Sequence, residues 1–113
     1  MQYMLLIYDN EKNQLPQDER NKMFAEYGTF TQDIIKSGNF QAGAPLQPTS
    51  TATTVRVRNG KALTVDGPFA ETKEQLGGYY LVEAENLDQA VAIAGKIPSA
   101  RYGSIEVRPV MKM

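Results

Sequence analysis

The sequence predicts an α+β fold in which two helices cover one face of an antiparallel sheet. The main observation is the order of hydrophobic patterns along the chain, which is β-α-β, a hairpin, and then β-α-β. Two such halves are typical of a ferredoxin-like sandwich, here with an inserted hairpin. The length of 113 residues fits a single domain over residues 1–113, because a chain of this size can bury a core without disulfides or metals.

The first half begins with a strand over residues 3–8, where apolar side chains fill nearly every position. Pro16 suits the first turn of a helix, and Gly38 supplies its end. Apolar residues recur along that helix at spacings of four, three and four, which indicates a face turned to the core. They are Met23, Tyr27, Phe30 and Ile34. A short strand over residues 40–46 and a polar loop over residues 47–53 follow.

A hairpin is expected between the two halves, because Asn59 and Gly60 are the residues preferred in a two-residue turn. Asn86 is expected to cap the second helix, with Gln89 at the capping-box position. Pro109 is typical of a strand end or a sheet edge. The expected elements are hairpin strands over 54–58 and 61–65, a strand over 79–84, a helix over 87–96 and a strand over 104–111.

The first strand has a second apolar face that the two helices do not cover. Side chains alternate along a strand, so Met4, Leu6 and Tyr8 point one way, and Tyr3, Leu5 and Ile7 point the other way. An uncovered apolar patch of that size favours association. We therefore expect a homodimer that closes face to face, with a partly barrel-like interior.

Composition excludes several classes of function. The chain has 12 basic and 13 acidic residues, a net charge of −1, so it shows no electrostatic footprint for direct contact with nucleic acid or an anionic membrane. It contains no cysteine and no histidine, which removes thiolate chemistry and the most common general base. No acidic cluster indicates a metal site, and no phosphate-binding loop indicates a cofactor. We expect no metal and no cofactor.

The N-terminal residues predict a strand and not a leader sequence. MQYMLLIYDNEKN lacks a basic n-region, and acidic residues follow its short apolar run. No segment approaches the roughly 20 apolar residues needed to span a bilayer. A cytoplasmic location is therefore the expectation.

Residues 66–84, DGPFAETKEQLGGYYLVEA, resemble the signature of the YCII-related family, in the branch called DGPF-domain proteins. The segments MQYMLLIY, GAPLQP and IEVRPV resemble the same family, so the likeness covers nearly the whole chain. The resemblance implies a dimeric α/β barrel version of the ferredoxin-like fold. Some relatives are thought to be small enzymes with a His–Asp pair, which this chain without histidine does not have. Others are associated with extracytoplasmic-function sigma factors.

Asp66 has two interpretations. Aspartate before Gly67 and Pro68 ordinarily accepts backbone N–H groups of a turn, and this structural role is favoured over a role as general base or ligand contact. Phe69 follows directly, and a carboxyl group buried beside it would have a raised pKa. Lys73 lies in the same charged loop, where it either pairs with a carboxylate in solvent or reaches over a cleft toward an anion.

The remaining candidates lie on strands. Tyr79 and Tyr80 point to opposite faces, so one packs under a helix and the other faces the cleft; Tyr80 is taken as a ligand-binding candidate with Tyr8. Arg108 shares a face with Glu106 and either binds an anion or pairs with that glutamate.

Two hypotheses for the function follow. The first is a homodimer with a small-molecule cleft lined by Tyr8, Asp66 and Arg108, and with acid–base chemistry by Asp66. The adjoining loop adds Gly67, Pro68 and Phe69 as candidates for ligand contact. The alternative is a non-catalytic regulatory protein that acts with a sigma factor.

Overall fold

The computed structural model describes residues 1–113 and has its elements in the predicted order. The strands are β1 (Gln2–Asp9), β2 (Phe40–Pro45), β3 (Thr53–Arg58), β4 (Lys61–Asp66), β5 (Gln75–Glu83) and β6 (Ser104–Pro109). The helices are α1 (Gln17–Lys36) and α2 (Leu87–Gly95), and short 3-10 turns span Thr49–Thr51 and Pro98–Arg101.

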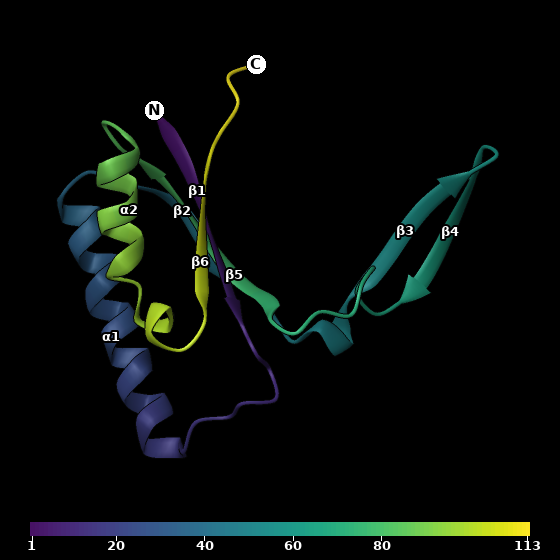
Figure 1. Cartoon of the computed structure of the whole chain (residues 1–113), viewed down its shortest axis with the longest axis horizontal. Coiled ribbons are helices and arrows are strands. Elements are labelled where there is room, and N and C mark those ends of the chain that lie inside the picture. Colours follow the sequence, from purple (N-terminus) through teal and green to yellow (C-terminus); the bar gives the residue numbers. More distant parts are fainter.

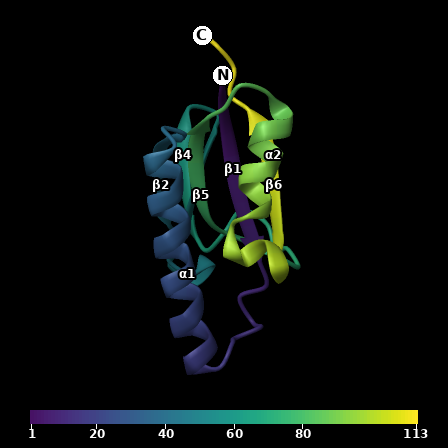
Figure 2. The ribbon, with the colours of Figure 1, turned by 90° about the vertical axis from the view of Figure 1, so that its left-hand side faces the viewer.

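The main sheet has the strand order β2-β5-β1-β6, and every neighbouring pair is antiparallel. β1 therefore lies between the halves and pairs with both β5 and β6. Figure 2 shows α1 and α2 side by side in front of this sheet. The order and the one-sided helix layer confirm the predicted ferredoxin-like sandwich with an inserted hairpin.

The core lies between the sheet and the two helices. Tyr3, Leu5 and Ile7 of β1 are buried there, and Leu5 is fully enclosed. Phe30 and Ile34 of α1 are also buried, as expected from the apolar spacing along that helix. The rest of this cluster comes from β5, α2 and the turns around them: Val82, Ala84, Ala90, Ile93, Ala94 and Ile97. Every second side chain of β1 thus packs into the core beneath the helices, as strand alternation predicts.

Local signals in the sequence are confirmed at the turns and caps. Asn59 and Gly60 adopt φ values of 53° and 75°, as a tight hairpin turn requires. Gly38 ends α1 with φ 82°. The side chain of Asn86 accepts the backbone N–H of Gln89 at 2.9 Å, while Gln89 Oε1 accepts the N–H of Glu85 at 2.7 Å. Two hydrogen bonds therefore cap the N-terminus of the second helix, as the sequence predicts.

β5 begins at Gln75, four residues earlier than the predicted strand at residue 79. The pairing shifts from Ile7–Gly78 to Tyr8–Leu76, so Gly77 forms a bulge. Gly78 approaches β2 so closely that an added Cβ would lie 3.1 Å from the carbonyl oxygen of Ala44. Glycine disfavours a strand by local propensity, but pairing on both sides overrides that propensity here.

The hairpin of β3 and β4 forms a two-stranded sheet of its own. We call residues 53–66 the arm. Figure 1 shows the arm on the opposite side of the main sheet from α1 and α2, extended away from it. None of the residues of the arm except Thr54 is even half-buried. Neither helix of the structure offers a run of apolar residues long enough to cross a bilayer.

Gly103 sets the position of β6 against the end of β1. A Cβ at this residue would lie 2.0 Å from the carbonyl oxygen of Tyr8, whereas a Cβ at Gly28 in α1 would meet nothing within 4 Å. We expect Gly103→Ala to lower the free energy of unfolding by about 3 kcal/mol, because backbone must move to admit the methyl group. Gly28→Ala, the matched control, should raise it by about 0.5–1 kcal/mol.

Urea denaturation of both variants measures these differences. Equal effects of the two substitutions would contradict the close approach of Gly103 to β1.

Candidate functional site

The face of the main sheet away from the helices, which we call the open face, is apolar at its centre. Strand alternation and register place Met4, Leu6 and Tyr8 of β1 beside Tyr79 and Leu81 of β5. All five side chains are half-buried. Neither tyrosine hydroxyl is hydrogen-bonded to another group of the chain. The open face therefore offers an apolar surface with two free hydroxyl groups.

An ion pair borders this apolar surface on β6. Arg108 lies opposite Met4, and Glu106 lies opposite Leu6, so both side chains belong to the open face. Arg108 Nε donates to Glu106 Oε2 at 2.8 Å, and a second guanidinium nitrogen contacts the same oxygen. This is the pairing that the sequence offered as one alternative for Arg108. Because the pair is exposed, the guanidinium retains donors for a second anionic partner.

Tyr79 and Tyr80 do point to opposite faces of β5. The hydroxyl of Tyr80 is hydrogen-bonded to Thr31 Oγ1 of α1 at 2.7 Å. Its ring also packs edge-on against Phe30, with the ring centroids 5.2 Å apart. The expectation that Tyr80 faces a cleft does not match this position under α1. Tyr79 is instead the tyrosine of β5 whose side chain lies on the open face.

Asp66 is the last residue of β4, at the base of the arm. Figure 1 shows β4 away from β1 and β6, the strands to which Tyr8 and Arg108 belong. The turn after Asp66 is held by other groups: the Gly67 N–H donates to the carbonyl of Ala52 at 2.7 Å, and Thr54 Oγ1 donates to the carbonyl of Gly67 at 2.8 Å. The expectation that the carboxylate accepts backbone N–H groups of this turn is wrong, because the carbonyl of Ala52 accepts the Gly67 N–H and Thr54 binds the Gly67 carbonyl. The Asp66 carboxylate is exposed and free of intrachain hydrogen bonds.

The residues next to Asp66 have separate roles. Gly67 has φ 100°, a conformation that glycine adopts without strain. Pro68 and Phe69 follow it on the surface, and the Phe69 side chain is 78% exposed. The motif is thus a turn that presents a carboxylate and an aromatic ring to the outside.

Lys73 lies in a shallow hollow of about 430 Å³ near the carboxyl end of β1. The other residues that line it are Asn10, Asn13, Glu74 and Tyr102. Lys73 makes no ion pair, whereas Glu74 accepts the hydroxyl of Ser104 at 2.9 Å. The structure therefore brings Lys73 to the end of β1 but not to the centre of the open face.

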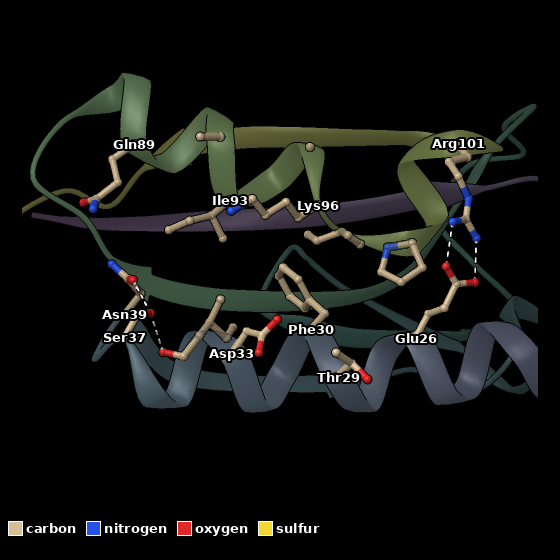
Figure 3. Close-up of a pocket in the computed structure, with 15 residues that line it drawn as sticks. Glu26, Thr29, Phe30, Asp33, Ser37, Asn39, Gln89, Ile93, Lys96 and Arg101 are labelled. Carbon is tan, nitrogen blue, oxygen red and sulfur yellow. Dashed lines mark hydrogen bonds and ion pairs between the residues drawn. The ribbon is translucent and has the colours of Figure 1, made fainter.

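A groove of about 510 Å³ runs between α1 and α2 on the helix side (Figure 3). Phe30, Ile34 and Ile93 contribute apolar walls, and Asp33 and Lys96 lie along its rim. Figure 3 also shows Glu26 and Arg101 at one end. They form a bidentate ion pair with N–O distances of 2.7 and 2.8 Å. The helix side thus has a groove with a charged end, separated from the open face by the sheet.

Sequence reasoning missed two carboxylates that position the site. Glu11 accepts both the N–H and the hydroxyl of Thr49, at 2.8 and 2.7 Å, and so ties the segment after β1 to the turn before the arm. Glu74 holds Ser104 at the start of β6. These partners lie 38 and 30 residues apart, so no local pattern could have revealed them.

Three comparisons place the chain among known proteins. The family model of the YCII-related domain matches residues 1–113. Uncharacterized protein R00369 of Rhizobium meliloti (strain 1021) is 35% identical over 114 residues, which cover 97% of this chain and 92% of the relative.

A solved structure has the same fold. It is 5-chloro-2-hydroxyhydroquinone dehydrochlorinase (TftG) from Burkholderia phenoliruptrix AC1100, in complex with 2,5-dihydroxybenzoquinone. The TM-score is 0.54 at 16% sequence identity, and the alignment covers 98% of this chain and 94% of that one. At this identity the likeness shows the fold alone.

The ion pair at the end of the groove makes stability depend on pH. Two hydrogen bonds from Arg101 hold the pKa of Glu26 below its ordinary value of 4.5. A carboxyl group with a depressed pKa in the folded state stabilises the protein above its ordinary pKa, and this contribution disappears as pH falls through the folded-state pKa. Glu26→Gln should therefore unfold at lower urea concentration than the native protein at about pH 7, and the difference should vanish at about pH 2.

Urea midpoints of both proteins at the two pH values check this expectation. A difference that stays the same at both values would contradict the charged nature of the pair.

Proposed function

The chain belongs to the YCII-related family, and from that premise we propose that it binds a small oxygenated ring between the open faces of a homodimer. Asp66 is the proposed acid–base group. The observation on which this proposal rests is the open face itself, with an apolar centre, two free tyrosine hydroxyls and an exposed arginine on one sheet.

The residue types of the open face suit a small ring better than a peptide or a nucleic acid. Met4, Leu6 and Leu81 provide flat apolar contact of the kind that lines small-molecule sites.

Tyr8 and Tyr79 can each donate a hydrogen bond to a ring oxygen. Arg108 can bind an ionised oxygen while it stays paired with Glu106. The set combines apolar contact with few polar groups, which gives orientation as well as affinity.

A second copy supplies the missing wall of such a site. One chain alone leaves the open face in solvent, and a ligand on a flat face would bury only one side. Two open faces packed against each other would enclose it, as in small-molecule sites that bury most of their ligand. TftG supports the ligand class, since this protein of the same fold is described in complex with a dihydroxylated quinone.

Asp66 is proposed as the proton acceptor because its carboxylate is free of intrachain partners. The chain has no histidine, so a carboxylate is the most suitable base that remains. A ring hydroxyl would transfer its proton to Asp66 as negative charge develops on the oxygen, and Arg108 would stabilise that charge. Correctly placed general bases contribute about 10²–10⁴-fold to a rate.

A regulatory protein that acts with an extracytoplasmic-function sigma factor stays the alternative prediction. Under this alternative, the chain would bind a protein partner on its outer surface and no small ligand on the open face. Direct measurement of ligand binding separates the two functions.

Isothermal titration calorimetry with 2,5-dihydroxybenzoquinone tests the ligand site. We expect the native protein to bind, and Arg108→Gln to bind about 10- to 100-fold more weakly, because a hydrogen bond to a charged group contributes about 1.5–3 kcal/mol. Arg101→Gln is the matched control, since Arg101 also pairs with a glutamate but lies on the helix side. It should bind like the native protein.

The same titration with Asp66→Asn tests the acid–base group. An amide cannot accept the proton of a ring hydroxyl, so Asp66→Asn should bind the ring more weakly than the native protein does. Asp33→Asn, in the groove between the helices, is the control and should have no effect. Weaker binding by the Asp33 and Arg101 variants alone would place the ligand in the groove and contradict the proposal.

A further inference from the structure

The arm is not supported by its own chain. Its two strands pair only with each other, and an isolated two-stranded hairpin is marginally stable in water. The radius of gyration is 16.0 Å, whereas a compact chain of 113 residues has about 13 Å. The arm accounts for this extended shape, since Figure 1 shows it reaching away from the sheet and helices.

The exposed surface is also too large for a lone compact chain. It measures 8213 Å², while a compact monomer of 12.6 kDa exposes about 6200 Å². The excess is about 2000 Å², and a stable interface needs about 800 Å² from each partner. A dimer that removed most of the excess would fall in the range of obligate homodimers.

The arm has one face that suits an interface. Residues opposite each other in the hairpin share a face, so the arm has two distinct sides. The first, which we call the valine face, consists of Thr53, Val55, Val57, Ala62, Thr64 and Asp66. The other side contains all three cations of the arm: Arg56, Arg58 and Lys61. Because charge is depleted at interface centres, the valine face is the side that packs against a partner.

Charge favours a second copy as that partner. The arm contains three basic residues and one acidic residue, so of the 12 basic and 13 acidic residues of the chain, nine basic and twelve acidic ones belong to the rest. The arm is therefore positive and the body negative. The cations lie on the side away from the valine face, so packing places them at the rim of the contact, beside a negatively charged body, twice in a symmetric dimer.

We infer that the arm of each chain crosses to the second copy, packs its valine face against it, and brings Asp66 and Phe69 to the partner's open face. This inference rests on the proposed homodimeric ligand site and deepens it, since each site then combines residues of two chains. It explains why Asp66 lies apart from Tyr8 and Arg108 in one chain. It also gives the exposed ring of Phe69 an apolar surface to cover.

Light scattering on two arm variants tests the packing. Val55→Lys places a charge on the valine face, and Leu63→Lys places the same charge on the other side; the native side chains are 60% and 49% exposed. We expect the native protein and Leu63→Lys to have twice the chain mass of 12.6 kDa. The Val55→Lys variant should have the mass of one chain. A dimeric Val55→Lys protein, or equal dissociation of both variants, would overturn the assignment of the valine face.

Cross-linking tests where Asp66 lies, because the chain has no cysteine of its own. A chain with Asp66→Cys is mixed with a chain with Met4→Cys, unfolded, refolded together, and treated with a short bismaleimide. A covalent pair that joins positions 66 and 4 is expected. Asp66→Cys mixed with Asp33→Cys, on the helix side, should give none.

The outcomes separate this inference from the proposed function. A native protein that stays at 12.6 kDa and does not bind the quinone would overturn the homodimeric site itself. A dimer that binds the quinone but gives no link between positions 66 and 4 would overturn only the crossing of the arm. Loss of the link in Val55→Lys, with retention in Leu63→Lys, would support both the crossing and its face.

Discussion

The fold depends on one constraint: its central strand is apolar on both faces, while the chain has helices for only one of them. Leu5 is fully enclosed beneath the helices, and its neighbour Leu6 points with Met4 to the open face. The hydrophobic effect is proportional to the apolar area removed from water, so burial of the second face stabilises the protein in the same way as burial of the first. The uncovered face is thus an incomplete core, which the proposed second copy completes.

An incomplete core is also a simple basis for a ligand site. Two apolar faces that pack against each other exclude water, and any gap left between them is lined by side chains already suited to a ring. Specificity then requires only a few polar groups. Tyr8, Tyr79 and Arg108 lie on the strands and not on flexible loops, so the sheet fixes their positions. In the proposed homodimer, the same surface serves association and recognition.

Close approach of backbone segments fixes the end of β1 where Tyr8 lies. Gly78 packs against the backbone of β2, and Gly103 packs against Tyr8 itself. The bulge at Gly77 shifts the pairing of β5 at the same level. Bulges of this kind re-aim side chains at the edges of sites. These glycines thus allow the backbones of neighbouring strands to pack closely where a side chain would not fit.

The sequence predicted the fold well because its local signals agree with one another. The apolar spacing along α1, the turn at Asn59 and Gly60 and the cap at Asn86 each depend on neighbouring residues alone, and all three are found. The start of β5 was missed because pairing with two strands overrides the low propensity of its glycines. The ion pair of Glu26 with Arg101 joins residues 75 apart, which no local pattern reveals.

The site was harder to predict, because alternation along a strand gives a face but not its neighbours. It grouped Tyr8 with Met4 and Leu6, and Arg108 with Glu106, but of the two tyrosines of β5 it chose Tyr80 for the cleft. The bond from Tyr80 to Thr31 shows that Tyr80 lies under α1 instead. Asp66 was expected to hold its own turn, but Ala52 and Thr54 do so. Those contacts depend on how the arm returns to the sheet.

The DGPF motif divides into two parts with different physical explanations. Gly67 and Pro68 are explained by the chain itself, since the turn needs a positive φ followed by a stiff residue. Asp66 and Phe69 are not, because the carboxylate has no partner in the chain and the ring is 78% exposed. Folding of one chain gains nothing from either side chain. The proposed contact with a second copy gives both side chains a partner, and the turn between them holds both at the base of the arm.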